Sequence, residues 1–343
     1  MKLKRNLLAF GLIAVFTVFT ACGPGEPKTP APTKNIWELV VENADLGKFE
    51  AEMLNQGLDA DLQGAGPMTL FAPSDQALTD LLEVLGIPDF SPVRDDIANA
   101  VLKYHILASK VASSEIVSGG SFTSSYNSEK IDVIDGPLLK SGATSQASVT
   151  TADIEATNGT IHIIDKVLVP YSIGVEIVAL LGTVGQSIFL GKDFSLFADA
   201  VTKADGYATA NTLPTLTSKL ADKSGTKYTV FAQVNAIFAS LPGGPYTIDS
   251  FTDAQWYGIL SNHIVPVLWT DFVGTSSNTT LSGGTLTVLL TDAPQDPTKG
   301  INSGVVLDSD GDQTANGQLA AESAATGSNG VIHVVAGILA PAP

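Results

Sequence analysis

A short acidic segment near the C-terminus has residue types and spacing suited to binding a hard cation. It reads Asp308-Ser309-Asp310-Gly311-Asp312, with carboxylates at alternate positions in a Gly-bearing turn, as at the start of an EF-hand loop. The match is partial, because Gln313 stands where that loop needs Gly and Leu319 where it needs a bidentate Glu. The pattern therefore predicts either a calcium site that orders this turn, with Asp308, Asp310 and Asp312 as ligands, or a solvated acidic turn.

Histidines are the second group that could do chemistry. A zinc site needs imidazoles that converge with carboxylates at fixed spacing, and the sequence has no His-x-x-x-His or Glu-x-x-His pair. It also has no Gly-x-Ser-x-Gly elbow and no Gly-rich loop suited to phosphate. We therefore predict a protein that is not an enzyme and needs no cofactor apart from the calcium considered above. The chain has four histidines: His105, His162, His263 and His333.

Two of these histidines fall on the apolar faces of expected helices. His105 ends a run with apolar residues at i, i+3 and i+4, and a helix start is expected at Ser91-Pro92. His263 ends a similar run, which opens with a capping box at Thr252 and Gln255. Such a histidine is either a core imidazole bonded on its ring nitrogens or, as part of a Tyr104-His105 pair, a pH-sensing or ligand-contacting group.

The other two histidines belong to expected strands. Residues 161–169 and 331–339 are rich in β-branched side chains and follow Asn-Gly turns, a pattern typical of strands that carry His162 and His333. An earlier strand, at 69–72, is expected to lead into a helix capped by Ser74 and ended by Gly86.

The N-terminus has the pattern of a bacterial lipoprotein signal. Basic residues precede an apolar run from Leu7 to Ala21, too short for a membrane-spanning helix. The only cysteine of the chain, Cys22, follows Phe19-Thr20-Ala21, which resembles a lipobox and implies lipidation at Cys22. The alternative is ordinary secretion with an incidental thiol. We therefore expect a signal peptide at 1–21 and a Pro-rich tether at 22–34.

Charge excludes nucleic acid as a partner. The 343 residues include 18 basic and 35 acidic ones, a net charge of −17. Loss of the signal would remove three basic residues and leave −20. A polyanion would be repelled, and no Lys/Arg cluster offers phosphate contacts.

Three segments of the chain occur twice in the same order, which indicates an internal repeat of about 160 residues. All four histidines stand at matched positions of the two copies. The paired segments are 68–78 with 228–238, 101–106 with 259–264, and 158–170 with 329–341.

These segments resemble the signature regions of the fasciclin-like domain family: the strand–turn–helix at Phe71-Ala72-Pro73, the Tyr104-His105 pair, and the terminal strand from Asn158 to Pro170. The second copy departs from that pattern at Gln233, Asn262 and Ala336. The resemblance implies an α+β fold in each copy, a curved antiparallel β-sheet wedge with short helices packed against it.

The expected organisation is a first fasciclin-like domain at 35–170 and a second at 172–341, with an insertion around 291–317. We predict a non-enzymatic adhesion or interaction protein, anchored by lipid to the membrane of a bacterial cell envelope, with the outer membrane or cell surface as its location. Its partner would be a protein or a glycan. The alternative is an envelope protein that binds or hydrolyses a small ligand in a pocket between the domains.

Overall fold

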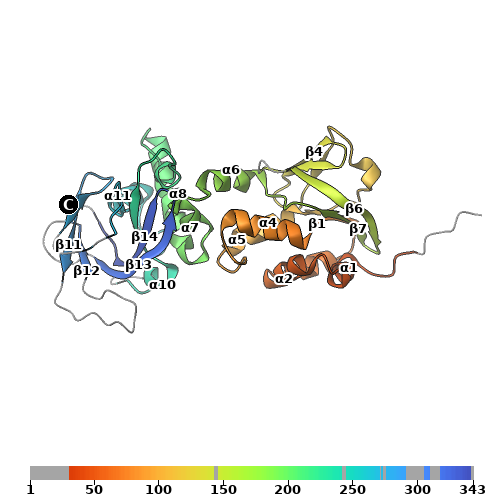
Figure 1. Ribbon diagram of the computed structural model, residues 1–343, viewed down its shortest axis with the longest axis horizontal. Helices are drawn as coiled ribbons and strands as arrows, with labels where there is room; N and C mark the ends of the chain where they lie inside the picture. The colour runs from red at the N-terminus through yellow and green to blue at the C-terminus, as the bar shows by residue number, and fades with distance from the viewer. Residues whose placement is uncertain are drawn as a thin grey trace, which may run out of the picture.

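The computed structural model describes residues 31–142, 146–241, 245–270, 272, 276–290, 305–309 and 317–340. These residues form two domains that lie end to end along the long axis of the molecule, connected by helix α6 (Tyr171–Leu180) (Figure 1). The expected signal at 1–21, Cys22 and most of the tether lie outside the described residues.

The first domain places its helices before and between the strands of one sheet. The sheet order is β2-β1-β7-β6-β5-β4-β3, and every neighbouring pair is antiparallel except β1–β7. Its helical segments are α1 (Ile36–Glu42), α2 (Gly47–Asn55), α3 (Asp59–Gln63), α4 (Asp75–Leu85), α5 (Asp95–Tyr104) and η1 (Ser113–Glu115). Its strands are β1 (Met68–Pro73), β2 (Ile106–Leu107), β3 (Ser121–Thr123), β4 (Lys130–Asp135), β5 (Leu138–Lys140), β6 (Gln146–Ala156) and β7 (Gly159–Ile164).

The second domain repeats this arrangement. The sheet order is β10-β11-β12-β13-β14-β8-β9, and β14–β8 is the parallel pair that corresponds to β1–β7. Its helical segments are α7 (Val184–Leu190), η2 (Lys192–Phe194), α8 (Ser195–Ala210), α9 (Leu216–Leu220), α10 (Asn235–Phe238) and α11 (Asp253–Asn262). Its strands are β8 (Tyr228–Ala232), β9 (Ile264–Val265), β10 (Ser277–Thr279), β11 (Thr285–Leu290), β12 (Val305–Asp308), β13 (Gly317–Gly327) and β14 (Gly330–Gly337).

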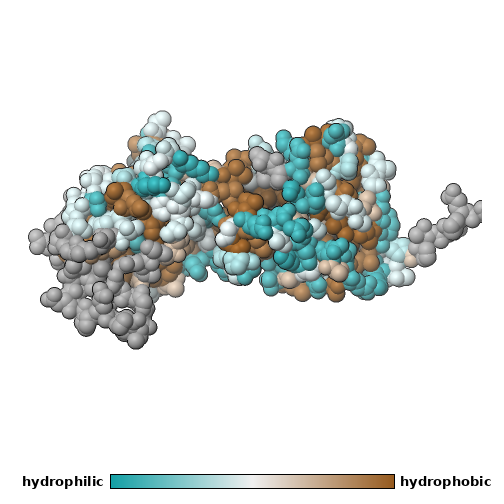
Figure 2. Space-filling view, viewed as in Figure 1, coloured by the Kyte–Doolittle hydropathy of each residue, from teal (hydrophilic) through white to brown (hydrophobic). Residues whose placement is uncertain are grey.

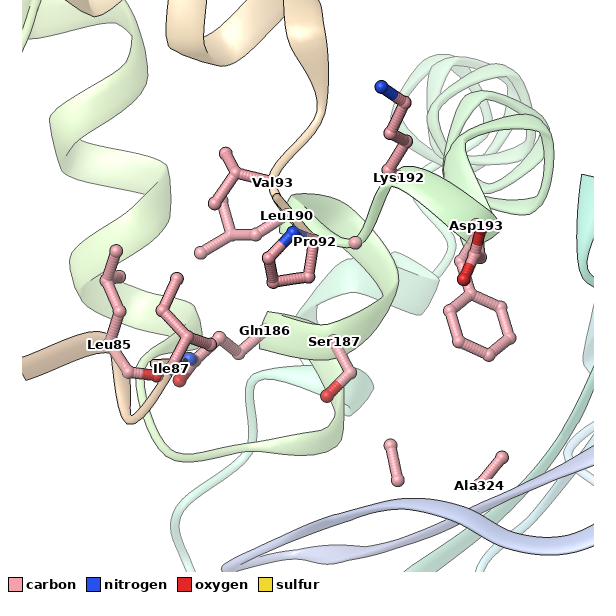
Figure 3. A pocket seen from close by; sticks show the side chains of 13 residues that line it. Leu85, Ile87, Pro92, Val93, Gln186, Ser187, Leu190, Lys192, Asp193 and Ala324 are labelled. Atoms are coloured by element: carbon pink, nitrogen blue, oxygen red, sulfur yellow. Dashed lines mark hydrogen bonds between the residues drawn. The ribbon is translucent and has the colours of Figure 1, made fainter. Parts of the chain in front are cut away.

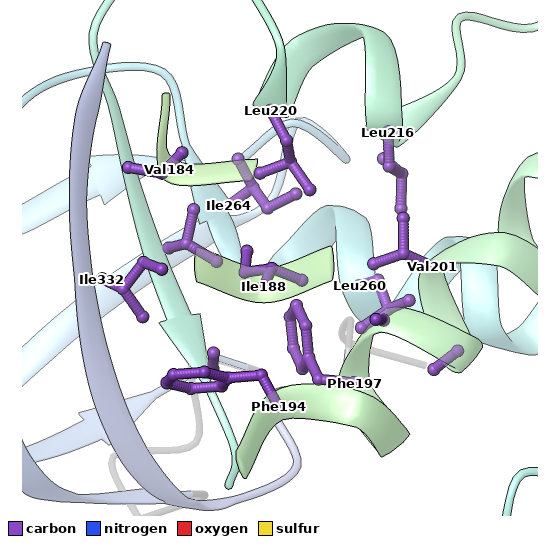
Figure 4. Close-up of a cluster of buried hydrophobic side chains, with 14 of the residues drawn as sticks. Val184, Ile188, Phe194, Phe197, Val201, Leu216, Leu220, Leu260, Ile264 and Ile332 are labelled. Atoms are coloured by element: carbon purple, nitrogen blue, oxygen red, sulfur yellow. The ribbon is translucent and has the colours of Figure 1, made fainter. Parts of the chain in front are cut away.

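The central strands are buried on both faces. In β1, Leu70 packs into a cluster with α1 to α5, and Phe71 on the other face packs into a second cluster under β4 to β6. In β8, Val230 and Phe231 are divided in the same way. Figure 4 shows the helix-side cluster of the second domain, where Ile188 and Phe197 lie close to Leu260. The α+β fold predicted for both copies is therefore confirmed.

Two of the three expected helix starts agree with the structure. Ser74 accepts a hydrogen bond from the N–H of Ala77, and the left-handed Gly86 ends α4. Thr252 and Gln255 form a capping box on α11. The expected start at Ser91-Pro92 is wrong, because α5 begins at Asp95. None of the helices in the described part of the chain is both long and apolar enough to span a bilayer.

Candidate functional site

His105 lies in the interior of the first domain and holds two segments together. Its Nδ1–H donates to the carbonyl of Val101 at 2.7 Å, and its Nε2 accepts from the N–H of Leu168 at 2.9 Å. The ring meets Phe49 edge-on, with centroids 6.4 Å apart. Burial lowers the pKa of His105 to about 4, against the upward effect of the Val101 carbonyl, so the imidazole is neutral at pH 7.

His263 does the same in the second domain. Its Nδ1–H donates to the carbonyl of Phe231 at 2.5 Å, and its Nε2 accepts from the N–H of Leu339 at 2.8 Å. Phe197 meets this ring edge-on, with centroids 6.3 Å apart. Burial again lowers the pKa to about 4. In each domain the imidazole thus connects the end of a helix with the segment that follows the last strand.

Tyr104 is as inaccessible as His105. Its side chain is fully buried, and its hydroxyl donates to the carbonyl of Lys130 at 2.5 Å. Burial raises the pKa of this phenol, and Glu129 and Asp132 raise it further. The Tyr104-His105 pair therefore does not face solvent in this structure. Its ring nitrogens and hydroxyl are taken up by backbone partners.

The second copy replaces the phenol by a smaller polar group. Asn262 is buried, and its Oδ1 accepts from Thr280 Oγ1 at 2.8 Å and from Ser282 Oγ at 2.5 Å. A second departure, Gln233 in place of Pro73, is also buried, and its side-chain N–H donates to the carbonyl of Gly337. Both departures thus make hydrogen bonds inside the fold.

His162 and His333 lie in the terminal strands, each beside an aromatic side chain of the parallel neighbour. His162 is 5.5 Å from Phe71 between ring centroids, and His333 is 5.7 Å from Phe231. His162 Nε2–H donates to the carbonyl of Val111 at 2.9 Å, and its Nδ1 accepts from the N–H of Asp153 at 3.2 Å. His333 Nε2–H donates to the carbonyl of Trp269 at 3.0 Å.

Sequence reasoning missed the asparagine that opens each terminal block. Asn158 Oδ1 accepts from the N–H of Ile36 at 2.9 Å, and its Nδ2 donates to the carbonyls of Leu62 and Gly64, both at 2.9 Å. Its amide thereby caps the start of α1 and the end of α3. Asn329 holds the N–H of Val184 and the carbonyl of Leu220 in the corresponding way, at 2.8 and 2.9 Å.

The glycine after each asparagine is required by close backbone approach. A Cβ on Gly159 would lie 2.0 Å from the carbonyl oxygen of Met68, and one on Gly330 would lie 1.9 Å from that of Tyr228. These contacts sit where the parallel strands begin to pair. The Asn-Gly dipeptide therefore serves the sheet as well as the turn.

A buried threonine was missed as well. Thr69 Oγ1 donates to the carbonyl of Ser109 at 2.7 Å and accepts from the N–H of Val111 at 2.8 Å. Thr229 makes the matching pair of bonds with Val267 and Trp269, both at 2.7 Å. The signal was available, because both residues lie inside the repeated blocks.

The expected calcium ligands are only partly visible. Asp308 ends β12 and is buried, whereas Asp310 and Asp312 lie outside the described residues. The neighbouring Ser309 donates to the carbonyl of Ala340 at 2.8 Å. Among the residues that the structure describes, no group of three or more His, Cys, Asp or Glu side chains is arranged to hold a metal ion.

The domain junction is built from backbone as well as side chains. Val93 and Gly191 form an isolated antiparallel bridge. Next to it the N–H of Arg94 donates to the carbonyl of Leu190 at 2.9 Å, and the N–H of Lys192 donates to the carbonyl of Pro92 at 2.7 Å. This explains why no helix starts at Ser91-Pro92, since these residues form a turn and the backbone after them pairs with the second domain.

Charged side chains surround that bridge. Arg94 forms ion pairs with Asp96 at 2.9 Å and, across the junction, with Asp199 at 3.0 Å. Lys192 of the second domain pairs with Asp95 of the first at 2.9 Å. The junction therefore relates the two domains through specific, oriented contacts.

A cavity of about 230 Å³ lies beside the junction (Figure 3). Two polar side chains of its lining are engaged with the protein. Lys192 bonds to Asp95, and Gln186 accepts from the N–H of Gly182 at 2.7 Å and donates to the carbonyl of Leu85 at 2.5 Å. Figure 3 shows Lys192 extending away from the part of the cavity near Leu85 and Gln186. The other labelled lining residues are mostly apolar: Ile87, Pro92, Val93, Leu190 and Ala324, with Ser187 and Asp193.

Both copies of the repeated unit match one known protein family. The model described as "Fasciclin domain" matches residues 44–170 and 192–341. The chain belongs to the fasciclin domain family. The bonded histidines and the Asn-Gly dipeptides thus lie at matching places in two fasciclin domains of one chain.

Relatives of these fasciclin domains occur in animals and bacteria. The chain is 32% identical over 150 residues to transforming growth factor-beta-induced protein ig-h3 of Sus scrofa, covering 42% of this chain and 21% of that protein. It is 31% identical over 140 residues to human periostin, covering 40% and 16%. It is 29% identical over 139 residues to protein sll1483 of Synechocystis, covering 39% and 73%. The match thus spans about a fifth of the pig protein's own length.

A solved structure of a fasciclin domain pair is also similar. It is described as a FAS1 domain pair from the insect cell adhesion molecule Fasciclin I, and the likeness covers 87% of this chain and 97% of that one. The identity is 18% and the TM-score 0.30.

Proposed function

We propose that this protein is a non-enzymatic adhesion or interaction protein of a bacterial cell envelope, which presents its two fasciclin domains to a protein or glycan partner. Fasciclin domains are typical of cell adhesion and interaction proteins. The observation that carries the proposal is the burial of the signature histidines. These histidines make hydrogen bonds inside the domains and do not reach the surface. We therefore expect a partner to be bound by the exposed surface residues.

The hydrogen bonds of the histidines support the absence of acid–base catalysis. A general base needs a free nitrogen within hydrogen-bond reach of a substrate proton. His105, His162 and His263 have both ring nitrogens bonded within the protein, and their side chains are fully buried. In our proposal these rings stabilise the fold.

The junction supports presentation of the domains as a pair. Val93 bridges to Gly191, and Arg94 pairs with Asp199, so the separation of the two outer surfaces is set by contacts within the chain. When two binding surfaces are held at a fixed separation, the second contact becomes intramolecular and binding to a repetitive partner is tighter.

A lipid at Cys22 would hold the pair at a membrane. The lipobox-like Phe19-Thr20-Ala21 precedes this cysteine, and the tether at 22–34 gives the first domain reach from the lipid. Because one acyl chain anchors a protein only weakly, stable attachment needs the several chains of a bacterial lipoprotein. We propose the outer membrane or the cell surface as the location.

The alternative, a small-ligand or hydrolytic protein, has the junction cavity in its favour. Its volume of about 230 Å³ lies below the ~300–1,000 Å³ usual for small-molecule sites. The polar side chains Lys192 and Gln186 in its lining already bond to Asp95, Gly182 and Leu85. We therefore favour adhesion.

An adhesion assay on cells tests the proposal. A strain that lacks this chain is compared with the same strain carrying the wild-type chain and with one carrying Cys22→Ser. We expect the wild-type chain to restore attachment to neighbouring cells or to a glycan-coated surface, and the unlipidated variant to fail. Equal attachment of all three strains would contradict the proposal.

A further inference from the structure

A second cavity lies between α4 of the first domain and the connecting helix α6. Its volume is about 350 Å³. Leu81 and Val84 of α4 line one side, Ile177 and Val178 of α6 line the other, and Val167 forms part of the wall between them. This cavity is a different one from that at the junction, although Leu85 lines both. Part of its wall, from Lys166 to Val169, belongs to the terminal signature segment.

Exposed apolar side chains surround this cavity. Val84 is 63% exposed, and on α6 the side chains of Tyr171, Val175 and Val178 are 66%, 55% and 39% exposed. The three α6 residues are spaced i, i+4, i+7, so they share one face of the helix. Figure 2 shows hydrophobic surface gathered at the centre of the molecule, over α4 and α6. Such a patch around a concavity is typical of a binding site.

The described lining of the cavity has two charged side chains, Asp80 and Lys166. Asp80 accepts a hydrogen bond from Gln76 at 2.7 Å, whereas Lys166 Nζ stands 3.7 Å from Asp80 Oδ2, beyond hydrogen-bond distance. Both charged side chains are nearly half exposed. An exposed ion pair of this kind contributes little to the stability of the fold. A ligand anion can therefore replace Asp80 as the partner of the ammonium at little cost in stability.

We propose that this cavity binds a medium-chain aliphatic carboxylic acid, with the alkyl chain between α4 and α6 and the carboxylate on Lys166. The volume lies at the lower end of the range of small-molecule sites, which suits a single short chain better than a phospholipid. The apolar walls supply affinity through burial of methylene groups. The ammonium of Lys166, whose pair with Asp80 is exposed and 3.7 Å apart, selects a negative head group.

Calorimetric titration of the full chain with decanoate tests whether the alkyl chain binds between α4 and α6. The decanoate is kept below the concentration at which it forms micelles. Val84→Trp and Val178→Trp each place a large ring in the cavity at an exposed position, so folding is preserved. Val117→Trp is the matched control, because Val117 is 55% exposed on another part of the first domain. We expect saturable binding of one decanoate to the wild type and the control, and at least a tenfold loss in both cavity variants. Equal affinity in Val84→Trp, Val178→Trp and Val117→Trp would overturn the proposal.

A separate experiment tests whether Lys166 binds the carboxylate. Lys166→Gln should weaken decanoate about fivefold to tenfold and leave 1-decanol unchanged, since the alcohol makes no ion pair. Decylammonium that binds as tightly as decanoate would contradict the role of Lys166. Light scattering on the same samples identifies the competing occupant. A dimer that dissociates in Val84→Trp and Val178→Trp would show that the patch packs against a second copy, and this too would overturn the proposal.

Discussion

Nε2 of His105 accepts a hydrogen bond from the backbone N–H of Leu168 at 2.9 Å, and this contact ties the end of α5 to the segment that leaves β7. His263 and Leu339 repeat the contact at 2.8 Å in the second domain. A neutral imidazole is needed at both places, because the accepting nitrogen cannot be protonated while it holds an N–H.

Stability should therefore fall in acid. Both histidines have folded pKa values of about 4, below the ordinary 6.5, so the unfolded chain binds more protons between these pH values. Their contribution is complete above pH 6.5 and is lost as the pH falls to about 4, on the order of 3 kcal/mol for each histidine. Urea unfolding from pH 7 to 4 measures it. In His105→Gln the free energy of unfolding should depend less steeply on pH between 7 and 4. The same pH dependence as in the wild type would contradict a buried, neutral His105.

Tyr104→Phe should weaken the first domain without affecting partner binding. The change removes the hydrogen bond from the buried phenol to the carbonyl of Lys130, which costs about 0.5–1.5 kcal/mol. Denaturant unfolding measures the loss, and binding of the partner to folded protein measures function. Reduced binding by a folded Tyr104→Phe variant would show that the phenol contacts the partner after all.

Gly159→Ala should damage the fold more than its size suggests. The new Cβ would lie 2.0 Å from the Met68 carbonyl, so the parallel strands must separate, at a cost of at least about 3 kcal/mol. Gly206→Ala is the matched control, since it lies within α8 with open space around it and should stabilise by about 1 kcal/mol. The melting temperature should fall in Gly159→Ala and rise in Gly206→Ala, each relative to the wild type. Equal melting temperatures of the two variants would contradict the close approach of Gly159 to Met68.

Arg94→Ala should loosen the junction. Its guanidinium is largely buried and bonds to carboxylates on both domains, and hydrogen bonds to charged groups are each worth about 1.5–3 kcal/mol. Amide hydrogen exchange in residues 90–95 and 189–193 should become about tenfold faster, since tenfold corresponds to about 1.4 kcal/mol. Lys110→Ala, which breaks the exposed pair with Glu155, is the control and should leave these amides unchanged. Unchanged exchange in Arg94→Ala would mean that the ion pairs do not hold the domains.

Cys22→Ser should abolish lipid attachment. A clickable fatty acid fed to cells should label the wild-type chain and not the variant, as measured by in-gel fluorescence. Label that persists on Cys22→Ser would refute lipidation at this residue.

The internal repeat made much of the fold predictable. Helical spacing and end signals identified α4 between Ser74 and Gly86, and the Thr252–Gln255 box identified α11, because both are local features. The start of α5 was not predictable, since Pro92 and Arg94 bond to Lys192 and Leu190 about 100 residues away. The parallel pairing of β1 with β7 is non-local in the same sense.

The candidate site was predictable in part. Helical spacing indicated an apolar environment for His105 and His263, and both are buried. Their partners Leu168 and Leu339 bond through the backbone N–H, which any residue carries, so no side-chain pattern marks them. Thr69 and Asn158 recur in the second copy as Thr229 and Asn329, and this repetition was the signal that was overlooked.

Retention of an envelope component on the full chain tests the proposed function most directly. Immobilised wild-type chain, a Tyr104→Phe chain and an empty matrix are exposed to the same solubilised envelope fraction, and retained proteins and glycans are identified by mass spectrometry. We predict that one protein or glycan is retained by both chains and not by the empty matrix. A wild-type chain that retains nothing beyond the empty matrix, across salt and calcium concentrations, would contradict the account.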